Sequence, residues 1–343
     1  MRIRQFRILT SLAAVAFALV LLVGCEPPLP PIKPSSLVIR PWEELFGVAI
    51  KPGSSDCYVV GSAGLLLTSH DGGRTWSRRR LNEDRPGGQM HQDIDLYSIN
   101  FAPDGKSGWI VGELGLIMHT SDGGDTWVVQ HSPAKVQLLS VAAVTPTEVS
   151  VVGDHGTLLW SNDGGANWTM QQMNNLTFYA VAFADPQNGW AVGEFQTILH
   201  SGDGGKTWKV QRGGEVADFT VPPYFVVVPQ GANTVTVAGQ SGVIATSKDG
   251  GKTWQDGKLP TERSIYGASV ASASSDTGSV WMAGAEGTIF EGVPGGEWRT
   301  KDPTFQDLTA VSSSQHLGLA IGLGGTIMRT ANGDHWDLIT ESK

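Results

Sequence analysis

The sequence predicts an all-β fold, a seven-bladed β-propeller built from four-stranded antiparallel blades. Three repeating features carry this prediction. The octet SGDGGKTW at residues 201–208 has four close copies, and a glycine and a tryptophan each recur seven times. The glycine usually follows Val, at Gly61, Gly112, Gly153, Gly193, Gly239, Gly284 and Gly322. The tryptophan closes each unit, at Trp76, Trp127, Trp168, Trp208, Trp254, Trp298 and Trp336.

Each repeat contains four strand-like stretches in a fixed order. Residues 178–210 read FYAVAFADPQNGWAVGEFQTILHSGDGGKTWKV. They contain an apolar strand, a GWxVG strand, a TIxxS strand, the octet, and a fourth strand that starts at Trp. Repeats of about 40–50 residues with four strands each are typical of propeller blades. Trp109, Trp190 and Trp281 lie in the second strand, where we expect them to fill the core between blades.

The octets are interpreted as structural corners. Aspartate accepts hydrogen bonds from nearby backbone N–H groups, and glycine adopts the positive φ that a tight turn needs. A phosphate loop would need a lysine and a helix after the glycines, and a calcium loop needs several oxygen ligands. We therefore expect no cofactor, no metal and no catalytic residue here. The corner aspartates are Asp71, Asp122, Asp163, Asp203 and Asp249.

The last two corners are shortened. Residues 294–298 read PGGEW and residues 332–336 read NGDHW, although the strands before them, GTIF and GTIM, are intact. A corner that loses its aspartate while the repeat survives is typical of scaffold.

The N-terminal residues differ from the repeats. Arg2, Arg4 and Arg7 precede an apolar run and the sequence LVGC, which ends at Cys25. This pattern resembles a bacterial lipoprotein signal over residues 1–24, with Cys25 lipidated after cleavage. An uncleaved anchor is the alternative. Residues 25–36 contain five prolines and are interpreted as an extended tether.

The propeller is expected over residues 37–343. Blade seven already has a fourth strand of its own, at residues 336–340. Residues 37–40 are therefore expected to add an outer strand that helps to close the ring.

Charge and cysteine content restrict the classes of partner. Removing residues 1–24 takes away three arginines and no acid, so the formal charge changes from −9 to −12. An acidic chain argues against nucleic acid as a partner and against polybasic docking on anionic lipid. If Cys25 is lipidated, Cys57 has no cysteine partner. We expect Cys57 to be a buried, inert thiol, with a reactive thiol as the alternative.

One face of the propeller is the candidate binding surface. The turn after the second strand and the link to the next blade share a face, and the corners lie on the other. The residues just after each recurring glycine sample the first face. They are Ser62, Glu113, Asp154, Glu194, Gln240, Ala285 and Leu323.

We expect Glu113, Asp154 and Glu194 to form an acidic arc that docks a partner protein, with solvated carboxylates of no role as the alternative. Two links are long, at residues 77–95 and 209–224, and insertions on one face of a repeat protein often mark a binding surface. The first contains a basic run, Arg78, Arg79 and Arg80, which is a further candidate for partner contact.

The repeat LxAVxFxDxxxGWxVGxxGxILxSxDGGxTW is similar to that of the photosystem II stability/assembly factor family. The resemblance runs from about Leu45 to Trp336 and implies a seven-bladed, lumenal or periplasmic, non-enzymatic helper. Cyanobacterial members assist assembly of the D1 protein. Photosynthetic members carry an arginine-rich face, whereas the comparable positions here are mostly acidic or neutral. The fold and the assembly class are implied, and the client stays open.

The corners also resemble the Asp box of sialidases and other BNR-repeat glycosidases. Sialidases need three converging arginines and a Tyr–Glu nucleophile pair, and this sequence has no Arg-Ile-Pro stretch. Tyr97 or Tyr179 with Glu113 or Glu194 would imitate only the pair. The starts of the inner strands are expected at Phe46, Tyr97, Leu139, Tyr179, Val226, Gly267 and Thr309, with no arginine among them.

The sequence therefore predicts a lipid-anchored scaffold outside the cytoplasm that binds a membrane protein or membrane-protein complex. Its compartment would be the periplasm, or the thylakoid lumen in a photosynthetic bacterium. The alternatives are an accessory protein of an envelope transporter and a carbohydrate-binding or sialidase-like protein.

Overall fold

The computed structural model describes residues 38–81, 94–214, 220–271, 278–314 and 317–339. The chain divides into two units, Met1–Ser36 and Leu37–Lys343. The first unit, which holds the expected signal, Cys25 and the tether, lies outside the described residues.

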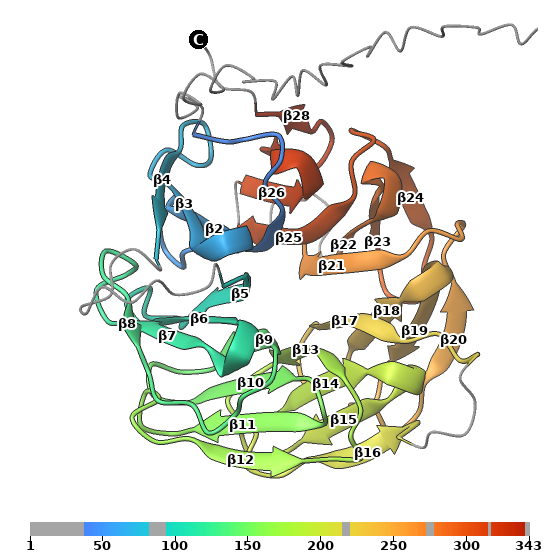
Figure 1. The fold of residues 1–343 in the computed structure, drawn as a ribbon. Coiled ribbons are helices and arrows are strands. Elements are labelled where there is room, and N and C mark those ends of the chain that lie inside the picture. The colour runs from blue at the N-terminus through green and yellow to red at the C-terminus, as the bar shows by residue number, and fades with distance from the viewer. Residues whose placement is uncertain (1–37, 82–93, 215–219, 272–277, 315–316, 340–343) are drawn as a thin grey trace, which may run out of the picture. The chain divides into compact units, whose positions relative to one another are not determined.

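The second unit consists of seven four-stranded antiparallel sheets arranged around an axis, which confirms the predicted propeller (Figure 1). The strands of each sheet follow one another in sequence order from the axis outward.

The seven innermost strands are β1 (Leu45–Ile50), β5 (Leu96–Phe101), β9 (Leu138–Ala143), β13 (Phe178–Phe183), β17 (Tyr224–Pro229), β21 (Ile265–Val270) and β25 (Leu308–Ser314). The second strands are β2 (Cys57–Gly61), β6 (Gly108–Gly112), β10 (Val149–Gly153), β14 (Gly189–Gly193), β18 (Val235–Gly239), β22 (Val280–Gly284) and β26 (Leu317–Gly322).

The third strands are β3 (Leu65–Ser69), β7 (Ile117–Thr120), β11 (Thr157–Ser161), β15 (Ile198–Ser201), β19 (Val243–Ser247), β23 (Ile289–Gly292) and β27 (Ile327–Thr330). The outer strands are β4 (Ser77–Arg80), β8 (Val128–Val129), β12 (Thr169–Gln172), β16 (Lys209–Arg212), β20 (Gln255–Lys258), β24 (Trp298–Lys301) and β28 (Asp337–Leu338). Only β24 starts at its tryptophan; the other six outer strands begin one residue later than predicted.

The core is divided among the interfaces between neighbouring blades. Seven apolar clusters each combine side chains from two adjacent sheets. The second strands are buried on both faces, because each is covered by a sheet on either side. Trp109, Trp190 and Trp281 are fully buried in these clusters, as the sequence predicts.

The ring closes by packing of the first sheet against the last. Leu65 and Leu67 of β3 share a cluster with Leu319 and Ile327 of blade seven. The side chain of Thr309 also donates a hydrogen bond to the carbonyl of Leu45 at 2.6 Å.

The predicted closing strand at residues 37–40 is wrong, because the described residues Val38–Arg40 form no strand. The side chains of Val38 and Ile39 instead pack against the cluster between blades one and seven. The buried Glu43, 3% exposed, pairs with Arg78 at 2.6 Å, and its carbonyl accepts from the Gly325 N–H. This segment joins the two sheets through side chains and one carbonyl, so no extra strand is needed.

The corner aspartates hold their turns with both carboxylate oxygens. In blade four, Oδ1 of Asp203 accepts from the Thr207 N–H at 2.9 Å and from the Ser201 hydroxyl at 2.8 Å. Its Oδ2 accepts from the Thr207 hydroxyl at 2.6 Å. The buried Ser201 hydroxyl in turn accepts from the Gly205 N–H at 2.8 Å. The same network recurs at the other four aspartates.

The two shortened corners close with different chemistry. In blade seven Asn332 stands at the usual aspartate position, and the Thr330 hydroxyl accepts from the Gly333 N–H at 2.8 Å. The side chain of Asn332 donates to the carboxylate of Asp334 at 2.8 Å. Blade six has Gly292 in place of that hydroxyl residue, and a backbone bond from Gly296 to Val293 at 2.9 Å makes the turn. The strands on either side still pair, so the aspartate stabilises the corner without being required for it.

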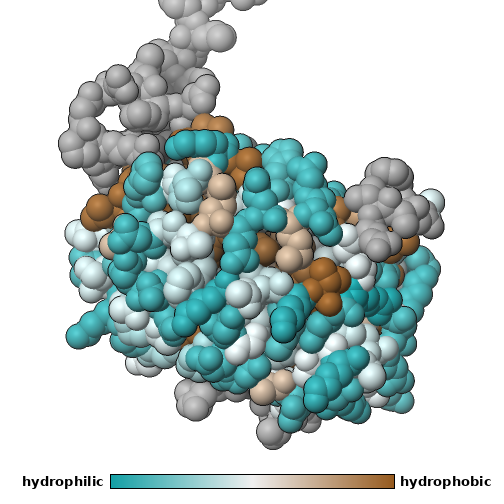
Figure 2. All heavy atoms as spheres, turned by 90° about the horizontal axis from the view of Figure 1, so that it is seen from below, coloured by the Kyte–Doolittle hydropathy of each residue, from teal (hydrophilic) through white to brown (hydrophobic). Residues whose placement is uncertain are grey.

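The rim of the propeller is mainly hydrophilic on the side where β12 and β16 lie (Figure 2). On that side, Figure 2 shows hydrophobic residues separated from one another by polar ones. Within the described ranges, no helix has the length and apolar character needed to cross a membrane.

Replacing Asp203 by Ala is expected to destabilise the propeller by about 1–2 kcal/mol, because it removes three hydrogen-bond acceptor contacts from a partly buried turn. The melting temperature of Asp203→Ala, measured by calorimetry, should fall below that of the wild type. Glu297→Ala, which removes an exposed carboxylate at the shortened corner of blade six, is the matched control and should melt like the wild type. Equal melting temperatures for Asp203→Ala and the wild type would contradict the corner role.

Stability should also fall at low pH. Asp122, Asp163 and Asp249 each accept hydrogen bonds from the residue four positions later in the sequence. These bonds lower the pKa of each aspartate to about 2. An unfolded aspartate titrates near 3.9, so below about pH 4 the unfolded chain binds more protons than the folded chain. This contribution is therefore complete above about pH 4 and is lost towards pH 2. Thermal melts at successive pH values should show that decline, with a shallower slope in the double variant Asp122→Asn, Asp249→Asn.

Candidate functional site

The turns after the second strands and the links between blades form one face, which we call the link face. Gly64 in the turn of blade one donates to the carbonyl of Ile94 in the link to blade two, at 2.7 Å. On the opposite face, Gly123 in the corner of blade two donates to the carbonyl of Lys106 at 2.8 Å. The predicted assignment of turns, links and corners to two faces is therefore confirmed.

Six of these turns are short 3-10 helices. They are η1 (Ser62–Gly64), η2 (Glu113–Gly115), η3 (Glu194–Gln196), η4 (Gln240–Gly242), η5 (Ala285–Gly287) and η6 (Leu323–Gly325). The equivalent turn of blade three, at residues 154–156, is not a 3-10 helix, although its middle residue has the same backbone conformation. The middle residue has a left-handed backbone in every blade, even where it is not glycine, as at Leu114 (φ 55°). Strain of this kind persists where the surrounding structure fixes the backbone.

The second residue of each inner strand is a bulge. The pairing register skips one residue between, for example, Tyr224 and Val226, which leaves Phe225 unpaired. Seven such bulges stand around the axis, at Phe46, Tyr97, Leu139, Tyr179, Phe225, Tyr266 and Thr309. We call these seven residues the axial collar. All seven line a hollow of about 370 Å³ on the link face.

Two of the predicted inner-strand starts are wrong by one residue. The sequence pattern predicts Val226 and Gly267 at this level, whereas the bulges place Phe225 and Tyr266 there. Val226 is buried in the core between blades five and six, and Gly267 is also buried. The correction changes the character of the axis, because five of its seven collar residues are aromatic.

The aromatic rings of the collar contact one another in two groups. Phe46 and Tyr97 lie with ring centroids 5.5 Å apart. Phe225 packs against Tyr179 at 4.9 Å and against Tyr266 at 5.9 Å. Each ring remains partly exposed to the hollow, so the collar presents aromatic surface to a ligand entering along the axis.

Two carboxylates of the predicted acidic arc also support the backbone. An oxygen of Glu113 accepts from the Asp95 N–H at 3.1 Å, and one of Glu194 accepts from the Thr177 N–H at 2.8 Å. Each ties the turn of its blade to the start of the inner strand in the same blade. These two glutamates therefore have a structural role as well as a place on the link face.

Asp154, the third member of the arc, differs from the two glutamates. No described residue donates a hydrogen bond to its carboxylate, and it is half-buried. Burial raises the pKa of Tyr179, and the charges of Glu194 and Asp154 raise it further. The pKa of Tyr97 is also raised, by burial and then by Glu113. The carboxylates of the arc thus act electrostatically on the collar tyrosines.

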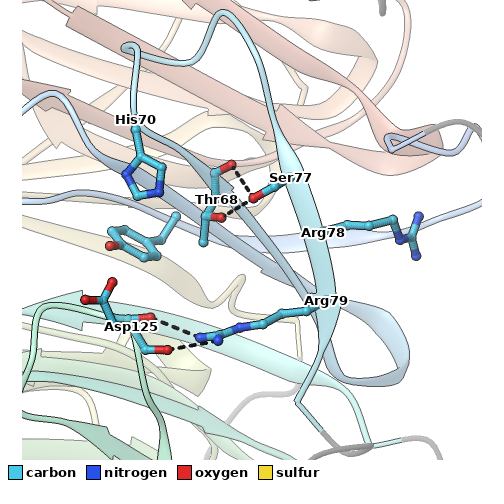
Figure 3. A pocket seen from close by; sticks show the side chains of 8 residues that line it. Thr68, His70, Ser77, Arg78, Arg79 and Asp125 are labelled. Atoms are coloured by element: carbon cyan, nitrogen blue, oxygen red, sulfur yellow. Dashed lines mark hydrogen bonds between the residues drawn. The ribbon is translucent and has the colours of Figure 1, made fainter.

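The basic run lies in the outer strand β4 and not in a loop, as the strand bounds show. Arg78 and Arg80 pair with the buried Glu43, with N–O distances of 2.6 and 3.6 Å. Arg79 donates to the carbonyls of Gly124 and Asp125 in blade two. Figure 3 shows Arg79 directed towards Asp125 and Arg78 directed away from it. The three guanidinium groups are therefore held by internal contacts on two sides of the strand.

Cys57 is buried in the cluster between blades one and seven. Burial raises the pKa of its thiol to about 12, so little thiolate is present at neutral pH. This agrees with the inert thiol that the sequence predicts. Among the residues that the structure describes, no group of three or more His, Cys, Asp or Glu side chains is placed to hold a metal ion.

The collar is the feature that sequence reasoning missed. The sequence does contain a pattern that marks the collar. In five repeats, the residue that follows the first buried position of the inner strand is Phe or Tyr. Alignment of the repeats alone does not show that this residue is unpaired, because a bulge is a property of the register with β2 and its equivalents.

Comparison with known proteins places these features in a family. Residues 42–136 and 171–335 match the family model described as Photosynthesis system II assembly factor YCF48. Photosystem II assembly lipoprotein Ycf48 of Synechococcus sp. (strain CC9902) is 40% identical over 70 residues, 20% of this chain and 19% of that protein. The chloroplastic stability/assembly factor HCF136 of Oryza sativa subsp. japonica is 32% identical over 104 residues, 30% of this chain and 23% of that protein.

These matched segments span about a fifth of the length of the curated relatives. A solved structure described as YCF48 bound to D1 peptide aligns with a TM-score of 0.65 and 20% identity. That alignment covers 86% of this chain and 96% of the other, and at this identity it supports the fold. The family model matches more than half of the sequence, and the chain therefore belongs to the photosystem II assembly factor family described as YCF48.

Proposed function

We propose that this protein is a non-enzymatic, lipid-anchored scaffold that works outside the cytoplasm and binds a membrane-protein partner during assembly. The observation that carries the proposal is family membership together with an open hollow on the link face. The hollow is lined by Asp307 and by the collar. Burial and the charges of Glu113, Asp154 and Glu194 raise the pKa of two of its tyrosines. A relative whose structure is described as bound to D1 peptide supports a membrane protein as the class of client.

A binding function fits the chemistry of the collar better than glycoside hydrolysis. A nucleophile can be activated by an adjacent general base, and the hydroxyl of Tyr97 lies 3.4 Å from Glu113, as in such a pair. A sialidase also needs arginines that converge on the substrate carboxylate, and no arginine is among the described residues that line the hollow. The fold itself does not decide the matter, since one fold hosts unrelated functions.

The anchor is tested by replacing Cys25. We expect the wild-type chain to sediment with membranes and to incorporate labelled palmitate, and Cys25→Ala to do neither. Cys57→Ala is the matched control and should stay with the membranes. If Cys25→Ala remains in the membrane and its intact mass retains residues 1–24, the anchor is the uncleaved N-terminal segment and lipidation at Cys25 is contradicted.

The client surface is tested by charge reversal at Asp154, whose carboxylate accepts no hydrogen bond from a described residue. The tagged protein is purified from detergent-solubilised membranes, and recovered membrane proteins are quantified by mass spectrometry. We expect Asp154→Lys to recover about tenfold less of the client, since removing an interfacial charge contact costs on the order of 1–2 kcal/mol. Glu297→Lys, on the corner face, is the control. Undiminished recovery of every partner with Asp154→Lys would contradict this surface.

A further inference from the structure

Among the described residues, the turns and links of the link face carry more acidic than basic side chains around the axial hollow. These turns and links contain eight carboxylates, at Asp95, Glu113, Asp154, Glu194, Glu262, Glu286, Asp302 and Asp307. The same segments contain two permanent cations, Lys135 and Arg263. Arg263 is held between Glu286 and Asp302 at 2.9 Å each. No lysine or arginine is among the described residues that line the hollow.

The hollow is large enough to admit a side chain. Its volume of about 370 Å³ lies in the range of ligand pockets. A second hollow of about 240 Å³ is lined by the collar together with the following residues of the inner strands, such as Ser98 and Ala180. A side chain that enters at the collar therefore meets aromatic rings first and small polar or apolar residues after them.

The combination of aromatic rings and carboxylates selects for a cation. The faces of Phe and Tyr attract an ammonium or guanidinium group through the ring quadrupole. A carboxylate at the rim adds a charge-assisted hydrogen bond, which is strongest to a planar guanidinium. Asp154 acts on both Tyr97 and Tyr179 electrostatically and accepts no hydrogen bond from a described residue. Its carboxylate is thus available to a ligand at the collar.

We propose that the axial collar binds an arginine or lysine side chain of the partner, inserted among the rings of Phe46, Tyr97, Tyr179, Phe225 and Tyr266 and neutralised by Asp154 and Glu194. This inference rests on the proposed function as a partner-binding scaffold and adds the chemistry of the segment that is recognised. The partner is a basic peptide segment, in agreement with the charge of the link face. In the alternative, the rings only fill the end of the axis and bind nothing.

The test uses the full mature chain and three acetylated, amidated nine-residue peptides. Each has the sequence GSLGXGLSG, where X is arginine, its neutral isostere citrulline, or glutamate. Binding is followed by NMR titration at about 150 mM salt, which shortens the Debye length to about 8 Å and suppresses long-range attraction to the acidic chain. We expect the arginine peptide to bind about tenfold more tightly than the citrulline peptide and to shift the collar resonances.

Two variants separate the contributions of the rings and the charge. Asp154→Asn should reduce the preference for arginine over citrulline, while the fold is unaffected because no described donor is lost. The double variant Phe225→Leu, Tyr266→Leu keeps apolar volume but removes ring faces, and should weaken the arginine peptide several-fold. Phe305→Leu, which changes a 97% exposed ring on the link between blades six and seven, is the matched control and should bind like the wild type.

The outcomes distinguish this inference from the proposed function. Equal binding of arginine, citrulline and glutamate peptides, or shifts confined to residues outside the collar, would overturn the inference. If the same protein still recovers its membrane client, the proposed function stands and only the basic segment is wrong. If the arginine peptide binds at the collar but no membrane protein is recovered, the inference on the collar stands and the scaffold function fails.

Discussion

Burial of each sheet against its two neighbours is the interaction on which the rest of this protein depends. A four-stranded sheet of this size has two apolar faces, and neither is covered within its own repeat. The second strands are buried along their whole length, and each core cluster takes side chains from two sheets. Removing a single blade would therefore expose two such surfaces, which explains why the fold must close.

Closure places seven equivalent turns and seven bulges around one axis, and the function follows from what the sequence puts at those positions. The turns are compact because a link packs on them: a Cβ at Gly115 would lie 2.1 Å from the carbonyl oxygen of Ala134. The position of Gly115 is a glycine in every blade except blade four, which has Gln196. Gln196 has φ 53°, and its side chain accepts a hydrogen bond from Arg212 at 2.8 Å. The link that follows, at residues 209–224, is one of the two long ones.

The same face combines structural and recognition roles in a few side chains. Glu113 and Glu194 hold the backbone at the start of the inner strands, so they would be retained even in a chain without a partner. Asp154 has no such duty among the described residues, and the collar rings are partly exposed to the hollow, with Tyr266 at 38% exposure. These are the positions where a role in binding is separable from a role in folding.

Much of this architecture is determined by the sequence alone. The recurring glycine, octet and tryptophan set the number of blades, the strand order and the assignment of turns and corners to two faces, because these depend on local turn chemistry and on the repeat. The buried Cys57 and the core tryptophans follow from their places in that repeat.

Only the tertiary structure decided the features that depend on contacts between distant residues. Three features each require a partner strand or a neighbouring blade. They are ring closure by the bond from the Gly325 N–H to the Glu43 carbonyl, the internal bonding of all three arginines of β4, and the unpaired Phe225 and Tyr266. A one-residue shift in register moves a side chain from the core to the axis, and neither composition nor spacing in a single repeat reveals that shift.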